Sequence, residues 1–306
     1  MRERLAAMCI SRESRNGVKA ETNKRKPAGK RRLGPLSTDR HRLYEYSVQS
    51  PSFNIEFFDR VYKRAWGRPA RSLKEDFCGT ALLATEWVRT RPGNVAVAVD
   101  TDAKTLAWAR ANNLVSLSPA ERSRIKLVRA DVREIRAPKV EIIAAFNFSY
   151  FGFKTRRELL GYFLNARRSL KPGGLLILDV FGGWEAQMEV TDKTRNPGFT
   201  YVWEQTKFDP ISHSAGFHIH FDFHGGGGIR KAFRYDWRMW TIPEVRELLA
   251  DAGFSSIDVY WEGIDPETGE GNGVFKRVTK AENCPGWIAM LVATRGLPAR
   301  RLRRPR

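Results

Sequence analysis

The chain has 306 residues, of which 42% are hydrophobic and 11% aromatic, enough for a sizeable core in one large domain or two small ones. It contains no run of about 18 apolar residues, and its first residues lack the apolar segment of a secretory signal, so we expect neither a membrane span nor export. The net charge of +19 is concentrated at the ends. Residues 1–50 hold 13 Lys and Arg against 5 Asp and Glu, and residues 295–306 hold 6 Arg and no acid.

The two ends are predicted to be basic tails. Residues 1–37 are low in apolar content, so we expect them to be mostly disordered, and residues 295–306 form a second basic tail. Such tails could make weak, non-specific contacts with nucleic acid, or they could be solvated ends without a partner. Three cysteines far apart in the sequence predict neither a disulfide framework nor a zinc knuckle, and we expect a cytoplasmic protein. The oligomeric state is left open.

Strands and helices alternate between the tails. Residues 38–69 are predicted to form a helical cap segment, split at Pro51. Apolar strands separated by helices are expected at 72–76, 94–100, 124–131, 140–147 and 175–181. Strands without polar alternation are typical of a parallel sheet that is covered on both faces. We therefore predict a doubly wound α/β domain over residues 70–294, with a mostly parallel, seven-stranded sheet.

The pattern changes after Gly183. Alternating strands at 200–208, 216–223 and 229–240 predict a three-stranded antiparallel insertion over about residues 198–240. A capping box at Thr241 then opens a helix, and strands at 255–261 and 286–294 complete the large sheet. We expect the insertion to act as a lid over a substrate.

The turn after the first strand, EDFCGTAL (75–82), carries one glycine and two carboxylates. A dinucleotide site needs several glycines at this point so that the backbone can approach a pyrophosphate, which Glu75 and Asp76 would repel. The carboxylates favour a ligand with a cationic group, whereas the start of the following helix favours a carboxylate. S-adenosylmethionine combines an ammonium, a carboxylate, a ribose and a sulfonium, and fits both preferences.

This turn and the motifs after it resemble the class I (Rossmann-like) S-adenosylmethionine-dependent methyltransferases. The first family motif commonly reads V-L-D-x-G-C-G-T-G; here CGT (78–80) matches, and Glu75 falls on the acidic position. Phe77 and Ala81 stand where the family has glycine. The phrase LKPGGLLILD (170–179) is also frequent in the family, and the resemblance covers about residues 40–294.

The resemblance implies a cofactor site along the carboxyl ends of the strands. Asp100 would hold the two ribose hydroxyls, Thr101 would lie beside the adenine, and Asp131 with Val132 would read the adenine amino group. Asn147 would face the methyl-transfer site. The full set of implied cofactor residues is Glu75, Asp76, Cys78, Gly79, Thr80, Asp100, Thr101, Asp131, Val132 and Asn147.

The acceptor site is less defined by the sequence. Tyr44 and Tyr46 are candidates for contacting the sulfonium or the acceptor, with core packing as the alternative. His218 and His220 share one strand face, where they could supply a base. A metal site or a polar outward face would give the same pattern, and we expect no metal.

Four further residues are predicted to contact the substrate. Phe148 and Tyr150 place aromatic rings beside the expected reaction centre. Arg234 and Arg238 could hold an anionic acceptor, or could form surface ion pairs.

The sequence therefore predicts an enzyme that transfers a methyl group from S-adenosylmethionine to an O or N atom of a small-molecule acceptor. One alternative is an RNA or ribosome-associated methyltransferase tethered by the basic tails. Another is a non-catalytic binding module on the same fold.

Overall fold

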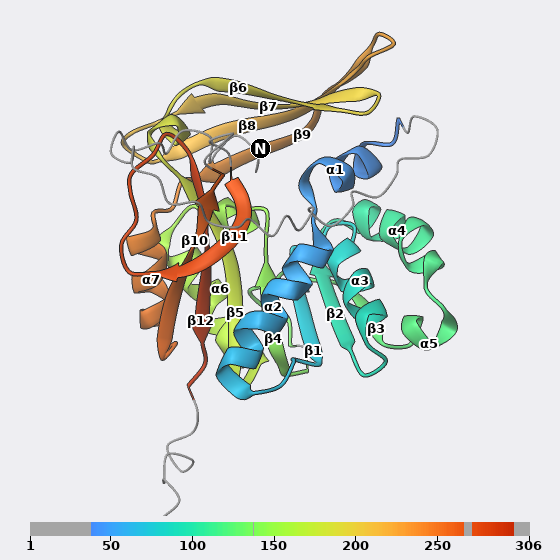
Figure 1. The fold of residues 1–306 in the computed structure, drawn as a ribbon, viewed down its shortest axis with the longest axis vertical. Coiled ribbons are helices and arrows are strands. Elements are labelled where there is room, and N and C mark those ends of the chain that lie inside the picture. The colour runs from blue at the N-terminus through green and yellow to red at the C-terminus, as the bar shows by residue number, and fades with distance from the viewer. Residues whose placement is uncertain (1–37, 137, 266–270, 297–306) are drawn as a thin grey trace, which may run out of the picture.

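A computed structural model describes residues 38–136, 138–265 and 271–296. These residues form a large sheet flanked by helices and a smaller antiparallel sheet at one end of it (Figure 1). The predicted tail 1–37 and nearly all of the predicted tail 295–306 lie outside the described residues. No helix in the described part of the chain is long and apolar enough to cross a membrane.

The large sheet has the strand order β11-β10-β12-β5-β4-β1-β2-β3. Its strands are β1 (Ser72–Asp76), β2 (Val95–Asp100), β3 (Ile125–Arg129), β4 (Val140–Ala145), β5 (Leu170–Gly182), β10 (Ser256–Ile264), β11 (Gly271–Val278) and β12 (Trp287–Thr294). The central strands pair in parallel, and β12 runs antiparallel to both β5 and β10. The predicted mostly parallel α/β core is confirmed.

The prediction of seven strands was wrong by one. β11 lies between the two strands that are predicted at 255–261 and 286–294, and it pairs with β10 at the edge of the sheet. An edge strand needs little apolar surface, and Phe275 is the buried residue of β11, so its sequence lacks the apolar run that marks the central strands.

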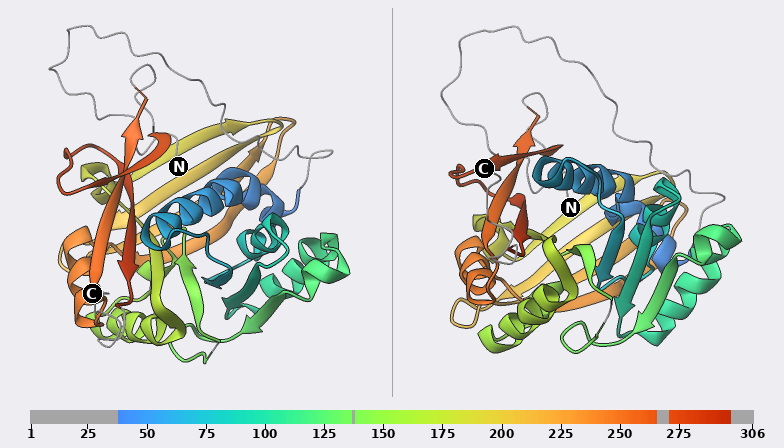
Figure 2. Two further views of the ribbon diagram at one scale, coloured as in Figure 1. Left: turned by 60° about the horizontal axis from the view of Figure 1, so that its bottom comes forward. Right: turned by 90° about the horizontal axis from the view of Figure 1, so that it is seen from below.

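Helices cover both faces of the large sheet. They are α1 (Arg40–Val48), α2 (Pro51–Trp66), α3 (Leu82–Thr90), α4 (Ala103–Asn112), α5 (Pro119–Arg122), α6 (Arg156–Ser169) and α7 (Ile242–Asp251). α2 and α6 lie on opposite faces (Figures 1 and 2). The capping boxes at Thr155 and Thr241 start α6 and α7 as the sequence indicates, because each threonine and the glutamate three residues later bond reciprocally to backbone N–H groups.

The small sheet has the order β6-β7-β8-β9 and is antiparallel throughout. Its strands are β6 (Val190–Asn196), β7 (Phe199–Phe208), β8 (Ser214–Phe223) and β9 (Gly228–Arg238). The predicted insertion was thus one strand short, since the polar sequence VTDKTRN of β6 lacks an apolar alternation. The small sheet lies across the carboxyl ends of the parallel strands, where Phe181 of β5 contacts Phe217 of β8 at a ring distance of 6.1 Å (Figure 1).

Candidate active site

The turn between β1 and α3 follows a left-handed backbone path. Phe77, Gly79 and Ala81 have φ values of 55°, 50° and 54°. Phe77 and Ala81 stand where the methyltransferase motif has glycine, so the chain keeps the glycine-like conformation with residues that adopt it at a cost of about 1–2 kcal/mol each. Burial of Ala81 in the core helps to offset this cost. The loop therefore keeps the path that the substituted glycines would have allowed.

Gly79 presents open backbone. A Cβ placed on Gly79 would meet no atom within 4 Å, so a ligand can approach the main chain closely there. Cys78 and Thr80 on either side are 1% and 3% exposed, and burial raises the pKa of the Cys78 thiol well above its ordinary value. Their side chains face the protein interior, which leaves the backbone as the part of this turn that a ligand would contact.

Asp100, at the end of β2, connects the turn after β1 to the turn after β2. Its Oδ2 accepts a hydrogen bond from Gly79 N at 2.8 Å, and its Oδ1 accepts one from Asp102 N at 2.9 Å. Asp102 in turn caps α4, and Thr101 is exposed beside it. The carboxylate of Asp100 is therefore held at the sheet edge between the turn after β1 and the turn after β2.

The carboxylates of Glu75 and Asp76 point to opposite faces of β1. Glu75 accepts a hydrogen bond from Ala84 N in the first turn of α3, and burial raises the pKa of Glu75 from 4.5 to about 8. Asp76 forms an ion pair of 2.7 Å with the fully buried Lys74 and accepts a hydrogen bond from Tyr162 of α6. Asp76 therefore supports the packing of α6, and we do not retain it as a cofactor residue.

Asp131 and Val132 follow β3 in a fixed turn. Asp131 accepts hydrogen bonds from the backbone and the guanidinium of Arg133, which lower its pKa below the ordinary value. The carbonyl of the buried Val132 accepts a hydrogen bond of 2.8 Å from Asn165. Both residues lie at the carboxyl end of β3, next to the end of β2 that carries Asp100.

The turn after β4 also contains residues with a left-handed backbone conformation. Asn147 and Phe148 have φ values of 57° and 56°, and their backbone N–H groups donate to the two carboxylate oxygens of Asp179 at 2.8 and 2.9 Å. Asp179 is buried in β5, 1% exposed. It fixes the backbone of Asn147 at the sheet edge. Asp179 is not among the residues predicted from the sequence, although an acid within the apolar strand LLILDVF is a detectable signal.

Tyr150 is buried directly after this turn. It lies in the short helical segment Ser149–Gly152, is fully buried, and packs against Phe151 and Phe163. Burial raises the pKa of its phenol well above the ordinary value. Tyr150 is a core residue in this arrangement, and we do not retain it as a substrate contact.

One face of the small sheet is aromatic and looks toward the large sheet. Trp237 of β9 contacts Phe148 at a ring distance of 6.3 Å, which brings this inner face over the turn after β4. Tyr44 of α1 contacts Phe233 at 4.9 Å and hydrogen-bonds to Tyr235. The structure thus brings Tyr44 and Phe148 together with the inner face of the small sheet.

Two further residues lie at the inner face of the small sheet, one on α1 and one on β6. Tyr46 of α1 contacts Phe199 of β7 at a ring distance of 5.9 Å. Asp192 of β6 lies directly opposite Trp203 in the β6–β7 register and therefore shares the inner face, where its charge acts on the phenol of Tyr201. Asp192 is not among the residues predicted from the sequence, because β6 itself is not predicted.

His218 and His220 lie on the outer face of the small sheet, on the side opposite Phe217 and Phe221. Both rings bond to Oε2 of Glu204, at 2.9 and 3.0 Å, and these bonds lower the pKa of Glu204. The structure therefore does not bring the two histidines to the carboxyl edge of the large sheet, and we do not retain them as catalytic residues.

The donor atoms of Glu204, His218 and His220 lie within 4.8 Å of one another, a spacing that a metal ion could use. Nδ1 of His220, however, accepts a hydrogen bond from Lys231 N. Nε2 of His220 therefore carries the ring hydrogen and donates it to Glu204. A nitrogen that carries the hydrogen has no lone pair to offer to a metal ion. The group is a hydrogen-bonded cluster.

Neither of the two arginines that were predicted to contact the substrate faces the candidate site. Arg238 stacks on Trp240 at 3.8 Å, pairs with Glu244 at 2.9 Å and donates to Lys154 O, so it joins the end of β9 to α7. Arg234 is exposed and lies opposite His218 in the β8–β9 register, on the outer face. Neither arginine reaches the inner aromatic face.

No protein-family model matches the sequence, and no curated protein matches it. Solved structures do match over most of the chain. A S-adenosylmethionine-dependent methyltransferase from Clostridium acetobutylicum is 17% identical, covers 84% of this chain and 97% of its own, and has a TM-score of 0.57.

Two further structures are similar. An amino pentose methyltransferase from Micromonospora echinaspora, solved with S-adenosylmethionine bound, is 17% identical over 86% of this chain and 100% of its own, with a TM-score of 0.59. A sugar N-methyltransferase from a Streptoalloteichus species is 17% identical, covers 92% of this chain and 100% of its own, and has a TM-score of 0.57. The chain has the fold of the class I S-adenosylmethionine-dependent methyltransferases.

Proposed function

We propose that the protein transfers a methyl group from S-adenosylmethionine to a nitrogen or oxygen atom of a small molecule. The observation that carries the proposal is the open backbone at Gly79, bonded to Asp100 at the carboxyl edge of a sheet with the methyltransferase fold. The amino pentose and sugar N-methyltransferases with a similar fold support a small-molecule acceptor.

The residues at this edge fit the cofactor. The bare backbone of Gly79 would accept the amino-acid portion, and the N–H groups at the start of α3 would favour its carboxylate. Asp100 has lone pairs beyond the two that it uses and would accept the ribose hydroxyls. Asp131 and Val132 would hold the adenine. When bound, the cofactor supplies the electrophilic methyl group.

The inner face of the small sheet would hold the acceptor over this edge. Tyr44 and Tyr235 offer aromatic faces and hydroxyl groups, and Asp192 adds a carboxylate. Aromatic rings together with a carboxylate attract a cationic group, so we favour an amine as the acceptor over an alcohol.

Methyl transfer is an in-line displacement, and the protein contributes chiefly position and orientation. The Asp179 carboxylate holds the backbone of Asn147 and Phe148 at the point where the acceptor would meet the cofactor. A protonated amine must lose its proton before it can react, and Asp192 on the inner face is the proposed acceptor of that proton.

The test is release of S-adenosylhomocysteine in the presence of matched pairs of small acceptors, each pair differing by an amine or a hydroxyl at one position. Amino sugars and the corresponding sugars form suitable pairs. We expect turnover with at least one amine, and slower or no turnover with its hydroxyl partner. Turnover with RNA alone, falling steeply with salt, would instead support the RNA methyltransferase alternative. Cofactor binding without turnover on any acceptor would support a binding module.

A further inference from the structure

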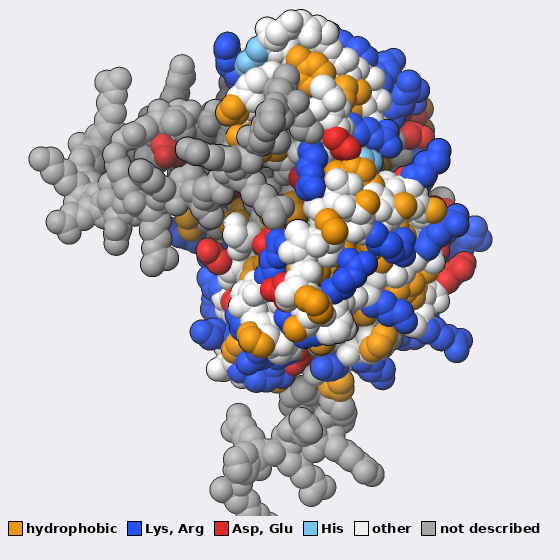
Figure 3. Space-filling view, turned by 90° about the vertical axis from the view of Figure 1, so that its right-hand side faces the viewer, with side chains coloured by type: hydrophobic (Ala, Val, Ile, Leu, Met, Phe, Trp, Pro, Cys, Tyr) orange, Lys and Arg blue, Asp and Glu red, His pale blue; other side chains and the backbone are white. Residues whose placement is uncertain are grey.

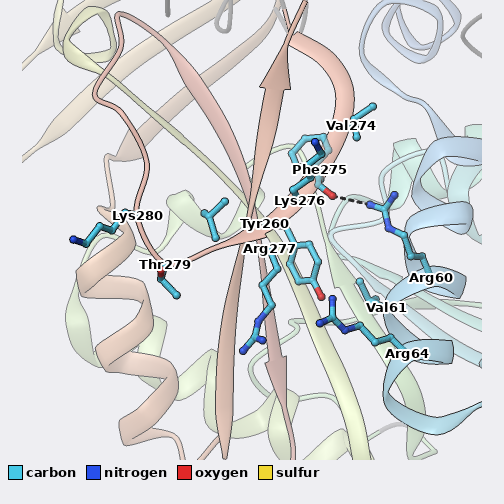
Figure 4. A pocket seen from close by; sticks show the side chains of 11 residues that line it. Arg60, Val61, Arg64, Tyr260, Val274, Phe275, Lys276, Arg277, Thr279 and Lys280 are labelled. Atoms are coloured by element: carbon cyan, nitrogen blue, oxygen red, sulfur yellow. Dashed lines mark hydrogen bonds between the residues drawn. The ribbon is translucent and has the colours of Figure 1, made fainter. Parts of the chain in front are cut away.

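A groove of about 820 Å³ lies between α2 and the strands β10 and β11, of which β11 is the edge strand of the large sheet (Figure 4). Eleven residues line it, among them Arg60 and Arg64 of α2, Tyr260 of β10, and Lys276, Arg277 and Lys280. Five of them are Lys or Arg and none is Asp or Glu, so the walls of the groove attract anions.

Three of the cations act electrostatically on one hydroxyl. Burial and the charge of Asp258 raise the pKa of Tyr260, and the charges of Arg64, Arg277 and Arg60 oppose that rise. Figure 4 shows the guanidinium of Arg64 beside the Tyr260 hydroxyl and that of Arg277 on the other side of the ring. The groove is thus a convergent site.

The partners of these arginines leave much of their charge available. Arg60 donates one hydrogen bond of 3.1 Å to the carbonyl of Phe275, and Arg277 pairs with Asp258 at 2.7 Å. Within the described part of the chain, neither Arg60 nor Arg64 pairs with a carboxylate. Two arginines on consecutive turns of α2 therefore face the groove with uncompensated charge.

Positive charge alone does not mark a site on this molecule. Figure 3 shows Lys and Arg side chains scattered over another side of the molecule. The groove differs because its cations line a hollow and converge. It is also distinct from the cofactor edge, since β10 and β11 lie at the opposite end of the sheet order from β2 and β3.

We propose that this groove binds the phosphate group of a small phosphorylated molecule. A guanidinium presents paired N–H donors that match the oxygens of a phosphate, and Arg60 and Arg64 line the groove with two such groups, that of Arg64 beside the Tyr260 hydroxyl (Figure 4). Single-stranded nucleic acid is a poorer fit because its bases need exposed aromatic rings for stacking, whereas Phe275 and Tyr260 are 5% and 7% exposed.

The test is a calorimetric titration with pyrophosphate at fixed ionic strength. The site variant is Arg60→Gln combined with Arg64→Gln. The matched control is Arg157→Gln combined with Arg246→Gln, which makes the same change in charge at exposed positions of α6 and α7. All four arginines are exposed, so both variants should fold, and thermal unfolding verifies this.

We expect the wild-type protein and the control to bind pyrophosphate equally, and the site variant to bind at least tenfold more weakly. Binding of S-adenosylhomocysteine should be the same in all three proteins. An equal loss in the control would show general attraction to a cationic protein and overturn the proposal, as would an absence of pyrophosphate binding. Binding of a single-stranded oligonucleotide that depends on Arg60 and Arg64, without pyrophosphate binding, would also overturn it.

Discussion

Gly79 N donates a hydrogen bond of 2.8 Å to Asp100 Oδ2, so the turn after the first strand and the end of the second are held together by one carboxylate. The same carboxylate bonds to Asp102 N with its other oxygen. The proposed cofactor would touch both turns, and this bond sets their spacing before any ligand arrives. Preorganisation of this kind lowers the entropic cost of binding.

Gly79→Ala should weaken S-adenosylhomocysteine binding at least tenfold, because the new methyl group would project into the open surface that the ligand needs. The substitution should also destabilise the fold by about 1–2 kcal/mol, since φ is 50° at this position. Gly226→Ala is the matched control. Gly226 also has positive φ and open space around it, but lies in the hairpin between β8 and β9. Equal affinities in the two variants would remove Gly79 from the site.

Glu75→Gln should stabilise the protein at alkaline pH. The folded pKa of Glu75 is about 8 and its ordinary value is 4.5, so folding keeps the proton on and the wild-type protein loses stability as the pH rises between these values. The slope is at most about 1.4 kcal/mol per pH unit. Glutamine stays neutral and can still accept the bond from Ala84 N. Urea unfolding at pH 5 and pH 9 checks this; a stability difference that does not grow with pH would contradict it.

Asp179→Asn should destabilise the fold by about 1–3 kcal/mol, because a carboxamide can accept from only one of the two N–H groups that Asp179 now satisfies. Turnover should fall further than affinity for S-adenosylhomocysteine, since the turn at Asn147 would lose its position. Asp236→Asn serves as the control, because Asp236 is an exposed acid on β9 and its loss should cost about 0.5 kcal/mol or less. Similar effects of the two substitutions would argue against a positioning role for Asp179.

His218→Ala should leave turnover within about twofold of the wild-type value, because the ring lies on the outer face of the small sheet and bonds to Glu204. Asp192→Asn, on the inner face, should reduce turnover with an amine by more than tenfold. Steady-state kinetics with one acceptor measures both. A large loss for His218→Ala together with unchanged turnover for Asp192→Asn would reverse the assignment of the two faces.

The sequence is a good guide to the fold where apolar patterning or capping chemistry is strong. β1 and the helices that start at the Thr155 and Thr241 capping boxes begin at or next to the predicted residues. It fails at β6 and β11, edge strands whose few buried residues leave no apolar pattern.

The candidate site could be predicted only in part. Strand ends locate Asp100 and Asp131, since the carboxyl ends of parallel strands share one edge. Alternation shows that His218 and His220 share a face, but it does not show which face covers the site. Adjacent residues such as Glu75 and Asp76 look like a pair in the sequence, although a strand turns them to opposite sides.

The measurement that tests the central claim most directly is a calorimetric titration of the folded protein, and of Asp100→Ala, with S-adenosylhomocysteine. We expect the wild-type protein to bind with a dissociation constant in the micromolar range, on the order of −8 kcal/mol. Asp100→Ala should bind at least tenfold more weakly, because the ribose hydroxyls lose their acceptor. No binding by the folded wild-type protein, or the same affinity in both proteins, would contradict the proposed site.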